Sequence, residues 1–97
     1  MAEWTFLTND GLVLIYIGNH PDSTGLEIAQ AVGITERAAR KIVAGLQADG
    51  YIEREKVGRR NHYHINSTQR LPYLAEHAVT VGELIGLLRR AQDQSEP

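Results

Sequence analysis

Cysteine is absent from the sequence, and its absence excludes disulfide bonds, thiolate metal sites and cysteine nucleophiles. Long hydrophobic runs are absent as well. The longest apolar run, LVLIYI at residues 12–17, is far shorter than the ~20 residues that cross a bilayer. The first residues also lack the basic side chains with which a signal peptide begins. We therefore expect a cytoplasmic protein that makes no membrane contact.

Motifs typical of enzymes are missing too. The sequence has no glycine-rich phosphate loop, no nucleophile elbow and no carboxylate pair that spacing alone would bring together. Aromatic residues make up only 6% of the chain, and Trp4, Phe6 and Tyr16 are more typical of a core than of a small-molecule pocket. We expect no enzymatic activity and no cofactor, and the identity of any small-molecule effector stays open.

Positive charge is absent from residues 1–36, which contain five acidic residues. By contrast, residues 37–70 contain eight lysines and arginines and three acidic residues, a net charge of +5 in a chain whose overall charge is -2. A length of 97 residues and 42% apolar content indicate one compact globular domain. The segregated charge favours a face for an anionic partner, and the alternative is chance clustering on a solvated surface.

A first helix is expected over residues 8–19, because Thr8 is a suitable N-cap and His20 and Pro21 follow the helical pattern. Its apolar residues surround much of the helix, which predicts that the helix is largely buried. The inner stripe is predicted as Leu12, Ile15 and Tyr16, widened by Val13 and Ile17.

A tight turn between two further helices follows. Thr24 and Glu27 form a capping box that opens a short helix, and Gly33 provides the left-handed stop at its end. Thr35 caps the third helix, expected over residues 36–49. Two helices joined so closely, with glycine at the corner, are the signature of a helix-turn-helix.

The third helix has one apolar and one basic side. At 100° per residue, one side carries Ala39, Ile42, Val43 and Leu46. The opposite side carries Arg37, Arg40, Lys41 and Ala44. The apolar side is therefore expected to pack and the basic side to face outward.

Alternating residues predict a β-hairpin after Gly50. The strands are expected at residues 51–57 and 62–65, with a basic turn at residues 58–61 between them. An isolated hairpin is marginal in water, so we expect it to lie against the helices. The packing side chains are predicted as Tyr51 or Ile52, together with Tyr63 and Ile65.

A last helix is predicted from the capping box of Thr80 and Glu83, after a polar turn at residues 66–69. Its apolar residues lie on more than one side, so it needs a partner, which is either the chain's own core or a second copy. We expect a homodimer through this helix, with help from the N-terminal segment. The predicted dimerisation residues are Val81, Leu84, Ile85 and Leu88.

The run TGLEIAQAVGITERAARKIVAGLQADGYIEREKVGRRNHYHI, residues 24–65, resembles the winged-helix domain of MarR- and ArsR-type bacterial transcriptional regulators. Residues 8–23 resemble it loosely. The resemblance implies a mainly α-helical fold with a small β-hairpin, of class α+β: a winged helix-turn-helix with an additional C-terminal helix. It places the recognition helix on residues 35–49 and the wing on residues 53–63. We expect residues 1–70 to form the DNA-binding domain and residues 71–97 its dimerisation segment.

A sequence-specific DNA-binding regulator of transcription is the function that these features predict. A major groove about 12 Å wide accepts one helix, whose first turns meet the base edges. Arg37 is the predicted specificity residue, and the resemblance puts Arg59 and Arg60 at or near a minor groove. The full predicted DNA-binding set is Thr35, Glu36, Arg37, Arg40, Lys41, Arg54, Lys56, Arg59 and Arg60. The partner is double-stranded DNA, as an inverted-repeat operator bound by a homodimer.

Several alternatives stay open at this point. The strongest alternative is a winged-helix protein-interaction module that does not bind DNA. Glu36 favours the helix dipole over a base contact, and Lys56 could pair with a carboxylate across the hairpin. ArsR-type regulators often bind metals, and histidines such as His62 and His64 could contribute, but their pattern does not favour a metal site and we predict none.

Overall fold

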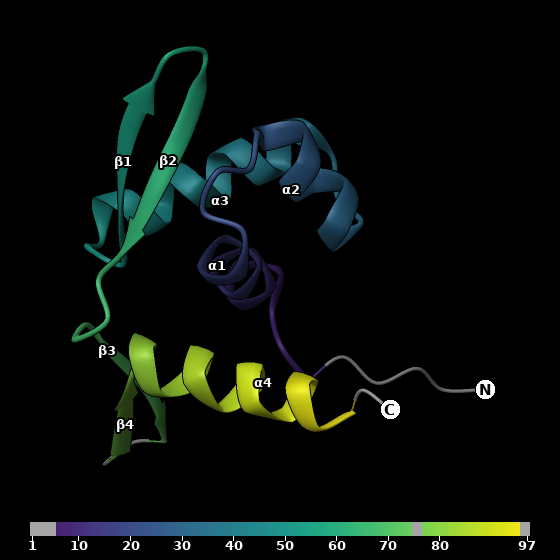
Figure 1. Cartoon of the computed structure of the whole chain (residues 1–97). Coiled ribbons are helices and arrows are strands. Elements are labelled where there is room, and N and C mark those ends of the chain that lie inside the picture. The colour runs from purple at the N-terminus through teal and green to yellow at the C-terminus, as the bar shows by residue number, and fades with distance from the viewer. Residues whose placement is uncertain (1–5, 75–76, 96–97) are drawn as a thin grey trace.

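Three helices and a hairpin are followed by a second hairpin and a last helix. The computed structural model describes residues 6–74 and 77–95 (Figure 1). Its elements there are α1 (Asn9–Asn19), α2 (Gly25–Val32), α3 (Glu36–Ala48), β1 (Ile52–Val57), β2 (Arg60–Ile65), β3 (Arg70–Leu74), β4 (His77–Thr80) and α4 (Val81–Ser95). The predicted fold class, a winged helix-turn-helix with an added C-terminal helix, is confirmed. Each helix in these ranges is too short or too polar to cross a bilayer.

The helices of the described chain begin at the caps that the sequence predicts. Each cap is a threonine whose hydroxyl accepts a hydrogen bond of 3.1 Å from the amide three residues later: Thr8, Thr24, Thr35 and Thr80. Glu27 and Glu83 complete capping boxes by accepting from the amides of Thr24 and Thr80, at 2.8 and 3.0 Å. These amide bonds lower the pKa of both carboxyl groups. Gly33 ends α2 with a φ of +86°.

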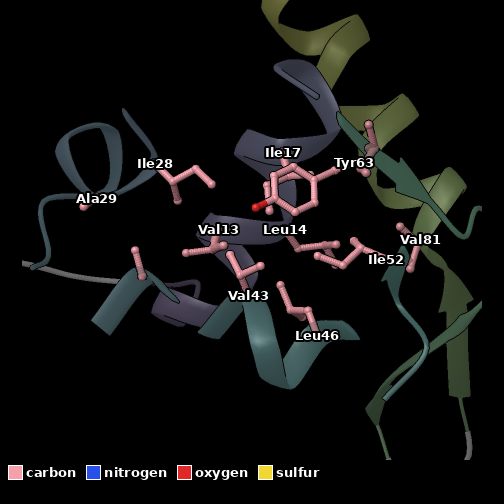
Figure 2. Close-up of a cluster of buried hydrophobic side chains, with 12 residues drawn as sticks. Val13, Leu14, Ile17, Ile28, Ala29, Val43, Leu46, Ile52, Tyr63 and Val81 are labelled. Atoms are coloured by element: carbon pink, nitrogen blue, oxygen red, sulfur yellow. The ribbon is translucent and has the colours of Figure 1, made fainter. Parts of the chain in front are cut away.

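Helix α1 lies at the centre of the molecule, with α4 on one side and α2 and α3 on the other (Figure 1). Its fully packed side chains are Val13, Leu14 and Ile17. Figure 2 shows Ile28 approaching them from α2, and Val43 and Leu46 approaching from α3. The prediction that Leu12, Ile15 and Tyr16 form the centre of the buried stripe is therefore wrong, because these three side chains are only half-buried.

The hairpin of β1 and β2 forms the wing. Val57 pairs with Arg60, so its loop is only Gly58 and Arg59, two residues shorter than the predicted turn. Gly58 has a φ of +63°, the conformation that a type II′ hairpin loop requires at its first position. Ile52 and Tyr63 are buried against the helices, as expected of the packing face.

A second hairpin, β3 and β4, occupies a region where the sequence predicted no strand. The polar turn before it binds the start of α4: the amides of Val81 and Gly82 donate to the carbonyls of Gln69 and Ser67, both at 2.9 Å. Two of the amides that a helix leaves unpaired at its N-terminus are thereby satisfied. The wing and α4 are thus joined by a short, hydrogen-bonded connection.

Helix α4 crosses α1 at Gly18. A Cβ atom built at Gly18 would lie 2.5 Å from Cδ1 of Ile85, so the missing side chain allows this close approach. Arg89 donates to the Gly18 carbonyl at 2.8 Å and to Oδ1 of Asn19 at 3.1 Å. Val81 and Ile85 are buried in the chain's own core, which corrects their placement on a dimerisation surface.

Candidate nucleic-acid interface

The basic side of α3 faces outward, as its amphipathic pattern predicts. Arg37, Arg40 and Lys41 are exposed, whereas Ala39 and Val43 are buried against the rest of the core. Figure 1 shows α3 above α1, with one end of α3 passing behind the wing. The outer side of α3 and the wing are therefore available to one partner.

A hollow of about 340 Å³ separates α3 from the wing, and we call it the wing hollow. It is lined by Gly25, Arg40, Val43, Ala44, Gln47, Arg54, Asn61 and Tyr63. Two guanidinium groups and two side-chain amides line it, with no carboxylate among the described lining residues. Such a lining attracts an anion and offers it several hydrogen-bond donors. The predicted DNA-binding set did not include Gln47 and Asn61. Helical spacing could have identified Gln47, because Arg40, Ala44 and Gln47 lie on one side of α3.

Arg40 is held in place by its own helix. Its Nη2 lies 3.0 Å from Oε2 of Glu36, one turn earlier. Arg40 also passes close to the N-terminus of α2, since a Cβ atom at Gly25 would lie 3.3 Å from its Nε. Glu36 therefore orients Arg40, in addition to lying in the first turn of α3, where a carboxylate complements the helix dipole.

Lys41 lies on the other flank of α3 from the wing. It lines a second hollow, of about 520 Å³, together with Asp10, Asp49 and Tyr51. The predicted basic set is therefore divided by the helix: Arg40 shares a hollow with the wing, whereas Lys41 lines a different hollow that also has two carboxylates in its lining.

The two faces of the wing differ in charge. The alternation of β1 puts Arg54 and Lys56 on the same face as the buried Ile52, which is the face toward α3. Glu53 and Glu55 lie on the opposite face. Lys56 pairs in register with Asn61, so it does not face a carboxylate directly across the hairpin. Glu55 instead approaches His64, with 2.8 Å between Oε2 and Nε2.

The two arginines near the wing tip have different surroundings. Arg59 is exposed in the loop itself. Arg60 turns back to the segment before α2, where its Nε and Nη2 donate to the Asp22 carbonyl at 3.0 and 2.6 Å. Its Nη2 also donates to Oε1 of Glu27 at 2.7 Å. The expectation that Arg60 is a tip residue like Arg59 is thereby corrected.

The histidines of β2 lie together on the outer face of the wing. The rings of His62 and His64 form an edge-to-face pair with centroids 4.7 Å apart. Nδ1 of His62 lies 2.5 Å from Oδ1 of Asp22. Within residues 6–74 and 77–95, no group of three or more His, Cys, Asp or Glu residues is arranged to hold a metal ion. Trp4 lies outside the described residues.

The model of the MarR family matches residues 7–60, more than half of the chain. The match begins just before α1, includes the whole helix-turn-helix and ends at the first residue of β2. No curated protein shows a significant match to the chain. The family match agrees with the fold described above and with one of the two regulator types that the sequence resembles. The chain belongs to the MarR family of winged-helix transcriptional regulators, which bind DNA.

Proposed function

We propose that α3 enters the major groove of a sequence-specific operator while the wing contacts the adjacent phosphate backbone and minor groove. The wing hollow is the observation that carries this proposal. Arg40 and Arg54 line it from two elements, next to the exposed outer side of α3. A helix inserted into a groove brings a phosphate strand close to its flank, which is where these two guanidinium groups lie.

The proposed contacts follow from the position of each side chain. Arg37, on the outer side of the first turn, reads a base, because the arginine fork matches the O6 and N7 acceptors of guanine. Arg40 and Arg54 bind phosphate from the wing hollow, and Lys41 binds phosphate on the other flank of α3. Arg59 reaches the minor groove. Lys56 follows the backbone from the inner face of the wing.

Thr35 and Glu36 act mainly by supporting α3. The Thr35 hydroxyl accepts from the Ala38 amide, and Glu36 holds Arg40. Both lie at the end of the helix that enters the groove, where their backbone groups approach the phosphates. We assign no enzymatic activity, because the family consists of regulators.

A homodimer is proposed to bind an inverted repeat, with half-sites about one helical turn apart or a multiple of it. Val81 and Ile85 belong to the core, so the dimer surface consists of the remaining apolar side chains of α4: Leu84, Leu87 and Leu88. A bond from Arg89 of α4 to Asn19 joins this helix to the end of α1. This contact supports the participation of the N-terminal helix in the proposed interface.

Selection from a random DNA library tests the proposal. The purified chain should enrich a palindromic motif, and light scattering after size exclusion should give the mass of a dimer. The alternative, a protein-interaction module, predicts that no motif is enriched over the starting library. Residue contacts are then assigned with single variants on the selected duplex.

A further inference from the structure

Arg60 joins the wing to the segment that precedes the helix-turn-helix. Its guanidinium donates to the Asp22 carbonyl and to the Glu27 carboxylate, in bonds of 2.6 to 3.0 Å. Next to it, the Tyr63 amide donates to the Pro21 carbonyl at 2.8 Å. We call Asp22, Glu27 and Arg60 the wing clamp.

Glu27 connects this clamp to the start of α2. The same oxygen, Oε1, accepts from Arg60 at 2.7 Å and from the Thr24 amide at 2.8 Å. The amide bond and the bond to Arg60 are the largest causes that lower the pKa of Glu27, so the carboxylate is kept ionised. One charged group thereby binds both the N-cap of the first helix of the helix-turn-helix and the wing.

The clamp acts where the core no longer supports the hairpin. Ile52 and Tyr63 are buried, but residues 53–60 are all exposed, so the outer part of the wing has little apolar packing. A two-stranded hairpin without such packing is marginal in water. Arg60 follows Arg59 directly, and its bonds therefore act one residue from the tip.

We propose that Arg60 is a positioning residue that holds the wing at a fixed distance from α3, rather than a DNA contact. This inference rests on the proposed DNA-binding function and deepens it. With the clamp closed, Arg59 and the α3 arginines are already placed for one duplex, and the wing does not have to be ordered on binding. The bonds to the Asp22 carbonyl and the Glu27 carboxylate occupy Nε and Nη2 of Arg60, so these two nitrogens can bind a phosphate only if the clamp opens.

Arg60→Ala and Arg59→Ala form a matched pair for the test, because each removes one arginine near the tip. Backbone ¹⁵N relaxation of the free protein reports the order of Gly58 and Arg59, and titration of the selected duplex at several salt concentrations reports affinity. Arg60→Ala should loosen the tip and weaken operator binding about 3- to 30-fold, with the salt slope unchanged. Arg59→Ala should leave the tip ordered and lower the slope by about one unit.

Glu27→Gln gives a second test. The direction of the change in DNA affinity separates a positioning role of Arg60 from a direct DNA contact. If Arg60 were a DNA contact, the loss of a negative charge beside it would strengthen DNA binding or leave it unchanged. The clamp predicts weaker binding in the wild-type background, and this loss should disappear in the Arg60→Ala background, where Glu27 has no guanidinium to hold. Gln retains an acceptor for the Thr24 amide, so the cap of α2 is preserved.

Arg60→Lys is the variant to use if Arg60→Ala does not fold. It keeps the positive charge but loses the planar guanidinium that donates through two nitrogens. It should loosen the tip at an unchanged salt slope. A tip that stays as ordered as in the wild type, or a salt slope reduced as in Arg59→Ala, overturns the inference. If the wild type enriches no DNA motif, the proposed function fails, while the relaxation data still show whether Arg60 orders the wing.

Discussion

Arg40 on α3 and Arg54 on β1 line the same hollow of about 340 Å³, although the end of α3 and the turn at Gly50 separate them in the chain. Two like charges on one hollow are unfavourable without a counterion, and Glu36 compensates only for Arg40. The proposed phosphate contact would supply that counterion.

Arg54→Ala should weaken binding to all duplexes by a similar factor and lower the salt slope by about one unit, because one phosphate contact is lost. Titration of the selected and a scrambled duplex at several salt concentrations measures both quantities. Glu53→Gln is the control, since Glu53 lies on the opposite face of β1. A loss confined to the selected duplex would contradict the phosphate assignment.

Arg37→Ala should cost about 1 to 3 kcal/mol on the selected duplex and relax the preference at one base position, because a bidentate base contact is removed. A repeated library selection with the variant shows which position is affected. Arg59→Ala should instead weaken selected and random duplexes alike. Equal effects of both variants on both duplexes would refute this division of roles.

Gly18→Ala should destabilise the fold by about 1 to 3 kcal/mol, because the new methyl group meets the buried Ile85 side chain where α4 crosses α1. Urea unfolding measures the free energy. Ile85→Val in the Gly18→Ala background should recover part of the loss by removing a methyl group at the crossing. Gly45→Ala is the control, since a Cβ atom there meets no other atom within 4 Å.

Leu87→Asp should convert the proposed dimer to a monomer, because Leu87 is 56% exposed on the free side of α4. Light scattering after size exclusion gives the mass directly. Leu26→Asp is the matched control: Leu26 is a leucine on α2 that is 51% exposed, away from α4. A variant at Leu87 that keeps the dimer mass would place the interface elsewhere.

Acid should destabilise the chain partly through its capping boxes. The pKa values of Glu27 and Glu83 are lowered in the folded state by the amide bonds that their carboxylates accept. A lowered folded-state pKa stabilises the fold above the ordinary value of 4.5, and this stabilisation is lost as the pH falls below about 4.5. Urea unfolding from pH 7 to pH 3 should therefore show a smaller decline in Glu83→Gln than in the wild type. Identical declines would show that this carboxyl group does not contribute.

Local chemistry explains why the helix starts could be predicted from the sequence. A threonine cap and its partner are three residues apart, so both are visible in one short window, as at Thr24 and Glu27. The basic side of α3 follows in the same way from helical spacing. By contrast, residues 12–17 are apolar without interruption, so periodicity could not identify Val13, Leu14 and Ile17 as the packed side of α1.

Long-range contacts explain the rest of the site. Arg60 and Asp22 are 38 residues apart, and no local pattern predicts that the arginine after the loop turns back to the segment before α2. The division of Arg40 and Lys41 between two hollows depends on where the wing and α1 lie. The second hairpin was not predicted, although it includes Pro72, because proline is depleted in strands and tolerated mainly in edge strands.

The hydrogen bonds from Val81 and Gly82 attach the turn at residues 67–69, which follows the wing, to the start of the helix proposed to join two copies. A Cβ atom at Gly82 would lie 3.1 Å from the Ser67 carbonyl oxygen, so the junction is also tightly packed. In a dimer of chains coupled in this way, the two DNA-binding surfaces would be held at a fixed distance and orientation. One base pair inserted at the centre of the operator rotates one half-site by about 35° relative to the other. A dimer with fixed DNA-binding surfaces would then lose contacts at one half-site.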